Sequence, residues 1–252
     1  MKRSALALLI CLASMATATA ETLVTSLSTY RVAINSNYTG ASLILFGSIE
    51  RDARTAPRAG PYDLVVTVRG PRRTALVREK EPLGPLWITR GQRRFVDQPV
   101  YLAVVSSRAI DDIAAAPMRE RLKLGLEAEF ASPLPGPNLM GEDFVEAFIR
   151  LRRQQGLFQE DPEGVVFLTQ NLFRAKIDLP AIAPTGLYEV ETILLSDGVP
   201  LSRQSTNFEV EKTGFEQATV VLARDHGFIY GLIAAASALV LGWLATVVFR
   251  RE

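Results

Sequence analysis

The longest apolar segment of the chain lies close to its C-terminus. Residues 228–249 contain no charged side chain, and charged residues flank them at 224–225 and 250–252. About 20 consecutive apolar residues are enough for one α-helix to cross a bilayer, and a helix satisfies its own backbone hydrogen bonds in hydrocarbon. The pattern therefore predicts a single transmembrane helix over 228–249 and a short tail of residues 250–252.

A shorter apolar run lies at the N-terminus. Lys2 and Arg3 precede it, and the small residues 18–20 follow it. A basic start, a short apolar run and small residues are typical of a secretory signal peptide. We therefore predict that residues 1–20 are removed on export. The tail would then be cytoplasmic, as the positive-inside rule expects for Arg250 and Arg251.

Between these two segments the chain begins and ends with strand-like patterns. Apolar and polar residues alternate over 22–27 and 30–34. Further strand-like runs lie at 62–69, 86–89, 93–96 and 100–106 and again after Gly164. Alternation with a period of two is typical of half-buried strands. The run 41–49 is more continuously apolar, which predicts a central strand covered on both faces.

The period changes to that of helices in the middle of the chain. Met118, Leu122 and Leu126 follow Pro117 at helical spacing, and apolar residues within 144–151 mark one face of a second helix. Such stripes are far more often core positions than a cofactor site. We therefore predict a helical insertion at about 108–158.

A corner and a turn in the last third of the chain suggest a particular architecture. Tyr188 follows Gly186 directly before an alternating strand, and Asp197 and Gly198 form a hairpin signal. A tyrosine at such a corner is typical of immunoglobulin-like sandwiches. We predict a mainly β fold, an immunoglobulin-like β-sandwich formed by residues 21–215 with the helical insertion. Two small domains joined by the helical stretch are the alternative.

Composition limits the chemistry that the chain can perform. Its 252 residues include one cysteine, Cys11, inside the predicted signal peptide, and one histidine, His226, beside the predicted membrane helix. A Ser-His-Asp triad needs a histidine, and a zinc site needs several histidine or cysteine ligands. The rest of the sequence contains neither residue type. We therefore predict no catalytic residue, no metal site, no cofactor and no enzymatic activity. The absence of disulfides is ordinary for a bacterial periplasmic domain.

We interpret acidic pairs such as Glu142-Asp143 as solvated surface positions and as first turns of helices, where negative charge is favoured.

Basic residues are unevenly distributed, although the net charge of the whole chain is only +1 and does not suggest a nucleic-acid partner. Many lie in the first half of the chain, around expected loops 51–60, 70–73 and 90–94. If these loops gather on one side, they form a positive patch for anionic headgroups or an acidic partner, and otherwise they are an ordinary soluble surface. The candidate patch consists of Arg51, Arg54, Arg72, Arg73, Arg93 and Arg94.

Small residues recur at every fourth position of the predicted membrane helix. Such spacing lets another transmembrane helix approach closely, although small residues are common in membrane helices generally. The candidate helix–helix contact consists of Ala234, Ala238 and Gly242, with Gly231 and Ala235 in a neighbouring row.

Several segments together resemble a known family. They are the signal peptide, YRVAINSNYTGASLILFGSIERD at 30–52, the middle helices, GLYEVETILLSDG at 186–198 and the C-terminal span. These resemble a family of alphaproteobacterial transmembrane proteins that has no established activity. The resemblance covers essentially the whole chain. It implies a single-pass bacterial inner-membrane protein with a periplasmic domain, associated with a sulfite-exporter-like permease.

Two classes of function remain open. The first is a membrane-anchored periplasmic interaction module, a non-catalytic accessory subunit of an inner-membrane complex such as a transporter, with an integral-membrane partner. The alternative is a periplasmic ligand-binding protein or enzyme with a carboxylate/Arg pocket. A deep cleft lined by Arg and Glu would favour the alternative, whereas an exposed apolar patch or strand edge would favour the interaction module. We expect the interaction module.

Overall fold

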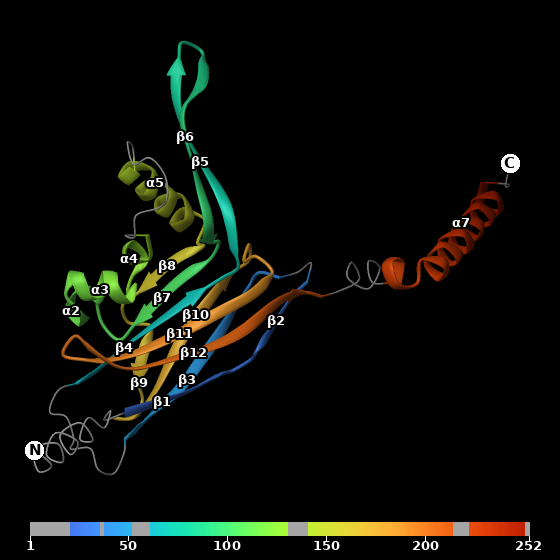
Figure 1. The fold of residues 1–252 in the computed structure, drawn as a ribbon. Helices are drawn as coiled ribbons and strands as arrows, with labels where there is room; N and C mark the ends of the chain where they lie inside the picture. The colour runs from blue at the N-terminus through green and yellow to red at the C-terminus, as the bar shows by residue number, and fades with distance from the viewer. Residues whose placement is uncertain (1–20, 36–37, 52–60, 131–140, 214–221, 250–252) are drawn as a thin grey trace, which may run out of the picture.

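The computed structural model describes residues 21–35, 38–51, 61–130, 141–213 and 222–249, and within these the chain is mainly β (Figure 1). The predicted signal peptide 1–20 and tail 250–252 lie outside the described residues. The strands form a four-stranded sheet, a six-stranded sheet and a separate two-stranded ribbon.

The four-stranded sheet is antiparallel and has the order β1-β3-β10-β9. Its strands are β1 (Glu21–Leu27), β3 (Gly40–Arg51), β10 (Leu172–Pro180) and β9 (Val165–Phe167). Along β3, Leu43 and Leu45 are buried, while Phe46 on the other face is exposed. The prediction that this strand is covered on both faces is therefore wrong, because its outward positions remain open in the described structure.

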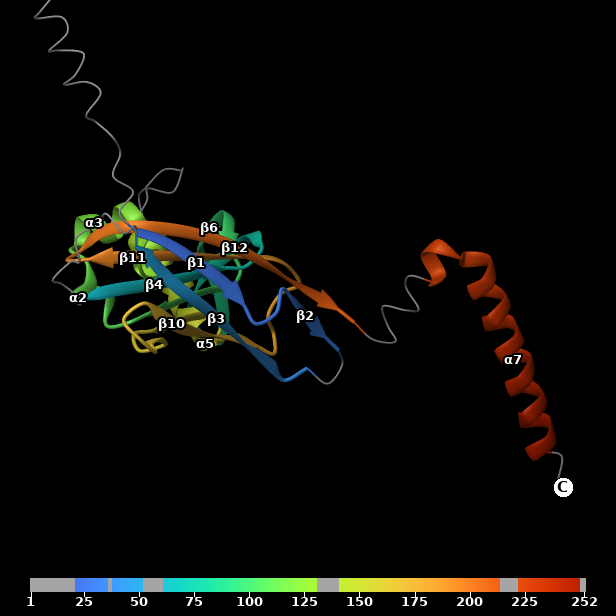
Figure 2. The same ribbon diagram turned by 90° about the horizontal axis from the view of Figure 1, so that it is seen from below.

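The six-stranded sheet has the order β2-β12-β11-β4-β7-β8. Its strands are β2 (Arg31–Ile34), β12 (Val199–Lys212), β11 (Gly186–Ser196), β4 (Tyr62–Arg69), β7 (Leu102–Ser106) and β8 (Phe158–Asp161). The two edge strands pair in parallel with their neighbours, and Figure 2 shows β2 beside the end of β12. The central strands β4 and β7 are buried on both faces, as their nearly continuous apolar sequences require.

Strands from the two halves of the sequence pair with one another in both sheets. In the four-stranded sheet β10 pairs with β3, and in the six-stranded sheet β11 pairs with β4. The strands before and after the helical stretch therefore share one set of sheets and one core, rather than forming two separate sets.

Four helices lie between β7 and β8 in the sequence and gather on one side of the sheets (Figure 1). They are α2 (Ile110–Ile113), α3 (Ala116–Leu122), α4 (Leu126–Phe130) and α5 (Gly141–Gln154). The sequence predicted one continuous helix through Met118, Leu122 and Leu126. The structure divides it, because Lys123 and Gly125 have φ values of 54° and 102°, in the left-handed region that ends a helix.

The corner and the turn expected in the last third of the chain are both present. The Tyr188 hydroxyl donates a hydrogen bond of 2.7 Å to the carbonyl of Pro184. Asp197 and Gly198 both have positive φ, as a type I′ hairpin turn between β11 and β12 requires. These two features fix the register of β11, which carries a residue of the buried charge network described below.

The two-stranded ribbon consists of β5 (Arg72–Leu83) and β6 (Leu86–Pro99) and projects beyond α5 (Figure 1). The sequence predicted short strands at 86–89 and 93–96. The structure joins them into one 14-residue strand, and irregularities in its pairing with β5 absorb the intervening residues.

Among the described residues, one helix is long and apolar enough to cross a membrane, α7 (Gly227–Phe249). The described residues from Gly227 to Val247 pack against no other part of the described chain. His226 directly precedes this helix.

Candidate functional site

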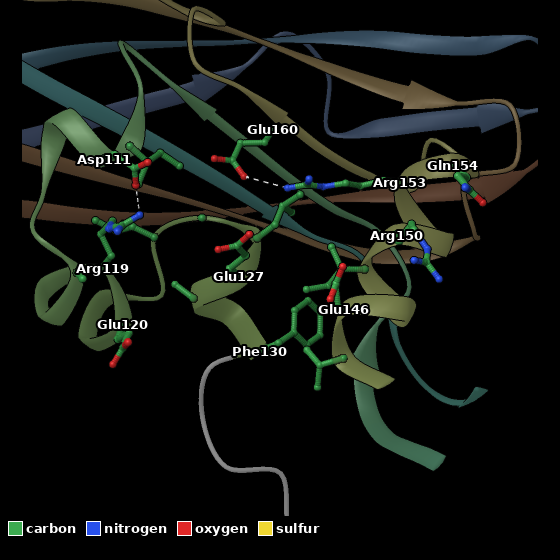
Figure 3. Close-up of a pocket in the computed structure, with 18 residues that line it drawn as sticks. Asp111, Arg119, Glu120, Glu127, Phe130, Glu146, Arg150, Arg153, Gln154 and Glu160 are labelled. Atoms are coloured by element: carbon green, nitrogen blue, oxygen red, sulfur yellow. Dashed lines mark hydrogen bonds and ion pairs between the residues drawn. The ribbon is translucent and has the colours of Figure 1, made fainter. Parts of the chain in front are cut away.

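A cleft opens between α5 and the three shorter helices, with a volume of about 1090 Å³ (Figure 3). Its floor is apolar and is formed by buried side chains that belong to the core, among them Leu124, Leu126, Phe130 and Ile149. Its rim is charged and exposed. The rim carries Asp111, Glu120, Glu127, Glu146, Glu160, Arg119, Arg150 and Arg153.

Part of the rim charge is internally paired. Arg119 donates a hydrogen bond to Asp111, and Arg153 lies 3.8 Å from Glu160 (Figure 3). The side chains of Arg153 and Glu160 are 50% and 34% exposed, so this pair is solvated and contributes little to stability. An apolar floor with a rim of both charges suits the binding of an amphipathic group more than acid–base chemistry at a dry site.

Acidic residues that are neighbours in the sequence, such as Glu127 and Glu129, separate in the structure. Asp111, Glu127 and Glu160 lie on the cleft rim, whereas Glu129 turns inward and is only 8% exposed. Among the described residues, no group of three or more His, Cys, Asp or Glu side chains is arranged to hold a metal ion.

A buried charge network connects the helices to the six-stranded sheet. Arg69, the last residue of β4, donates hydrogen bonds of 3.1 and 2.9 Å from Nε and Nη2 to Oε2 of Glu129 on α4. Its Nη1 donates a bond of 2.8 Å to Oε2 of Glu191 on β11. Arg203 on β12 donates to the other oxygen of Glu191, and Lys123 lies 4.0 Å from Glu129. The charges therefore alternate in sign from α4 to β12.

The network controls the ionisation of its members. Burial alone would raise the pKa of Glu191, but the hydrogen bonds from Arg203 and Arg69 and their charges outweigh it and hold that pKa below its ordinary value. Burial alone would lower the pKa of Arg69, but Glu129 and Glu191 outweigh this and raise it. Both groups therefore stay charged at neutral pH, and the network acts as a fixed structural link rather than a proton donor.

Sequence reasoning did not identify this network. The side chains that meet are separated by 60 residues for Arg69 and Glu129 and by 122 for Arg69 and Glu191. The one available signal was a charged residue at the end of the apolar strand 62–69, where an unpaired charge would be costly.

The structure does not bring the predicted basic residues to one place. Arg51 lies over the ring of Tyr62, at the first residue of β4, whereas Arg72 follows the last residue of that strand. Eight residues of strand separate these positions by roughly 23 Å. Residues 90–94 form part of β6 rather than a loop, so Arg72, Arg73, Arg93 and Arg94 all belong to the ribbon. Arg54 lies outside the described residues.

The predicted helix–helix contact residues lie on α7, where all five are exposed: Gly231, Ala234, Ala235, Ala238 and Gly242. A Cβ added to Gly231 or Gly242 would meet no atom within 4 Å. Ser237 and Thr246 donate hydrogen bonds of 2.9 Å to backbone carbonyls of the same helix, so these hydroxyls are satisfied inside it.

Comparisons with known proteins give one family. A family model described as "Putative transmembrane protein (Alph_Pro_TM)" matches residues 22–251. No curated protein sequence matches the chain significantly. The crystal structure of Spo0M, a sporulation control protein from Bacillus subtilis, aligns with a TM-score of 0.30 and 10% identity, covering 82% of this chain and 55% of that chain. This chain thus spans about half the length of that protein, and a likeness at this TM-score says nothing about function.

Proposed function

This chain belongs to the Alph_Pro_TM family of transmembrane proteins, and we propose that it is a membrane-anchored interaction module, a non-catalytic accessory subunit of a membrane complex such as a transporter. The observation that carries this proposal is the exposure of α7 along its length. No residue of this helix packs on the described β domain, and its row of small residues leaves open space beside Gly231 and Gly242. A helix with such a face allows close approach of a second transmembrane helix.

The proposal includes an orientation and a partner. Residues 1–20 are a signal peptide, the β domain is periplasmic, and Arg250 and Arg251 lie in the cytoplasm of a bacterial cell. The partner is an integral membrane protein, and a sulfite-exporter-like permease is the candidate that the family resemblance suggests. The positive charges of Arg250 and Arg251 support this orientation.

The proposal also treats the β domain as an immunoglobulin-like sandwich with a helical insertion. The strand orders β1-β3-β10-β9 and β2-β12-β11-β4-β7-β8, with β2 parallel to β12, support this architecture. The hydrogen bond from Tyr188 to Pro184, at the start of β11, supports it as well. Sandwiches of this kind commonly present strand edges and loops to partners.

Replacing Ala238 and Gly242 with leucine should reduce recovery of the membrane partner at least about tenfold, because two large side chains prevent close helix approach. The measurement is co-purification of the tagged full-length chain from native membranes in mild detergent, with quantitative mass spectrometry. Membrane insertion should be unchanged, because leucine is at least as apolar as the residues it replaces.

The matched control is the double variant Ala236→Leu with Val240→Leu. Two residues rotate a helix by about 160° measured the shorter way, so Ala236 faces away from Ala238. This control should retain the partner. Equal recovery in all variants would remove the small-residue face from the proposal.

The cleft favours a second candidate, a ligand-binding protein. Its apolar floor and its rim of arginines and glutamates would hold an amphipathic small molecule or peptide. Arg150 and Arg153 on α5 would then meet an anionic group of the ligand. A screen of the full chain for bound metabolites tests this candidate. Arg150→Gln and Arg153→Gln should reduce ligand binding, whereas the helix-contact variants Ala238→Leu and Gly242→Leu should leave ligand binding unchanged.

A further inference from the structure

The free end of the β5–β6 ribbon carries a cluster of exposed apolar side chains. Leu83, Leu86 and Trp87 are 65%, 67% and 69% exposed, and Ile88 is 42% exposed. They surround the turn at Gly84, whose φ of 62° suits the tight reversal. Large apolar side chains grouped at the end of a projecting hairpin indicate a binding surface, because a soluble surface rarely concentrates them in this way. We name these four residues the ribbon tip.

The ribbon is held firmly at its base and is free beyond it. Phe95 is fully buried and stacks on Phe148 of α5, with ring centroids 4.9 Å apart. Gly91 lies against Phe144, since a Cβ added there would come within 3.2 Å of that ring. Every residue from 78 to 90 is exposed. The tip therefore stands roughly 30 Å along the strand from its anchor at Phe95.

Basic residues lie immediately behind the tip. Residues 78–94 contain five basic and two acidic side chains, a net charge of +3. Of these, Arg90 pairs with Glu81 at 3.2 Å, while Arg78, Lys80 and Arg94 are exposed. An apolar tip containing tryptophan, with cations behind it, matches the order of hydrocarbon, interface and anionic headgroups in a lipid leaflet.

The ribbon leaves the β domain at the same end as the chain that leads to α7. Pro71, just before the ribbon, lies against Gly186, because a Cβ added to Gly186 would come within 3.2 Å of the proline ring. Gly186 pairs with Val210, and β12 ends at Lys212. Residues 213–226 then lead to α7, and a chain of that length reaches at most roughly 46 Å.

We propose that the ribbon tip inserts into the headgroup region of the same bilayer that α7 spans, with Lys80 and Arg78 against anionic lipid phosphates. The tether supplied by α7 keeps the tip at high local concentration near the membrane, so that weak individual contacts suffice. The contact would fix the tilt of the β domain relative to the membrane. It would thereby fix the direction in which the cleft between the helices opens.

Trp87 reports directly on this insertion, because the chain contains only two tryptophans. The full-length Trp243→Phe variant is reconstituted in nanodiscs of phosphatidylcholine and phosphatidylglycerol, with or without lipids brominated near the headgroup. We expect brominated lipid to reduce Trp87 emission about twofold. The reduction should be smaller in discs of phosphatidylcholine alone, which lack the anionic headgroups.

Two variants in the same background serve as controls. Leu83→Ser with Leu86→Ser changes only exposed side chains and should abolish the quenching. Trp87→Phe with Val199→Trp moves the reporter to an exposed position at the opposite end of the six-stranded sheet, beside Ser196, and its emission should not respond to bromine.

Three results would overturn the proposal. If brominated lipid does not reduce the intensity of Trp87 emission in either disc type, the tip does not enter the bilayer. Emission that shifts only when a disc holds two chains assigns the tip to a second copy of this protein. Emission that shifts only after addition of membrane proteins assigns it to a protein partner.

Discussion

Replacing Arg69 with methionine is expected to lower the free energy of unfolding of the β domain by about 3–5 kcal/mol. The substitution leaves the carboxylates of Glu129 and Glu191 in the interior without the guanidinium to which both are bonded. Each is at most 8% exposed, so water cannot replace the lost bonds. Chemical denaturation of the full-length chain in mild detergent, followed by circular dichroism, measures the change.

Arg203→Met is the matched control, because it removes the other arginine that contacts Glu191. The Arg203 side chain is 61% exposed, so its loss should cost no more than about 1 kcal/mol. An Arg69→Met variant as stable as the Arg203→Met variant would contradict the view that Arg69 links the helices to the sheet.

The same network predicts a dependence of stability on pH. The folded-state pKa of Glu191 lies below its ordinary value of 4.5, so its contribution is complete above that value and is lost as the pH falls through the folded-state pKa. In Arg69→Met part of this contribution is missing, because Glu191 has lost one of the two arginines that hold its pKa below the ordinary value. The difference in unfolding free energy between the two proteins should therefore narrow as the pH is lowered below about 4.5.

Replacing Phe148 with alanine is expected to cost about 3–5 kcal/mol and to release the ribbon from α5. Phe148 stacks on Phe95 and meets Phe130 and Phe158 edge-on, with ring centroids 5.7 and 5.6 Å away. It therefore joins the ribbon, α4, α5 and β8. Hydrogen exchange of the full-length chain should show faster exchange of β5 and β6 amides in this variant.

Leu151→Ala provides the comparison for Phe148, since it removes a large side chain from the same helix at a position 46% exposed. This variant should change stability by less than about 1 kcal/mol and leave ribbon exchange unchanged. Unchanged ribbon exchange in Phe148→Ala would show that the aromatic cluster does not anchor the ribbon.

The elements that the sequence predicted correctly are those with a strong local pattern. The run 228–249 has no charge over its whole length, the alternation in 22–27 spans almost a full strand, and 62–69 is nearly continuously apolar. Each pattern therefore identifies its element without knowledge of distant residues. The Asp197-Gly198 turn was equally local. The helix break at Lys123 was missed because a left-handed lysine has no distinctive sequence signal, although Gly125 beside it does.

The features that the sequence could not provide depend on long-range pairing. Nothing near Arg69 shows that its partners are Glu129 and Glu191. The pairing of β11 with β4 brings Glu191 to it, and the packing of α4 on the sheet brings Glu129. Which basic residues lie near one another likewise depends on strand pairing, which the sequence does not show. Arg51 lies over the ring of Tyr62 at the first residue of β4, whereas Arg72 and Arg73 come after the last residue of that strand. The ribbon was predicted only as short strands, because its bulges interrupt the alternation.

The most direct test of the interaction-module proposal is site-specific photocrosslinking from α7. A photoreactive amino acid is placed at Ala238 in one strain and at Ala236 in another, and native membranes are irradiated. The account predicts a crosslink from position 238 to a different integral membrane protein and a much weaker one from position 236. Equal crosslinking from both positions, or crosslinks from 238 to lipid alone, would contradict it.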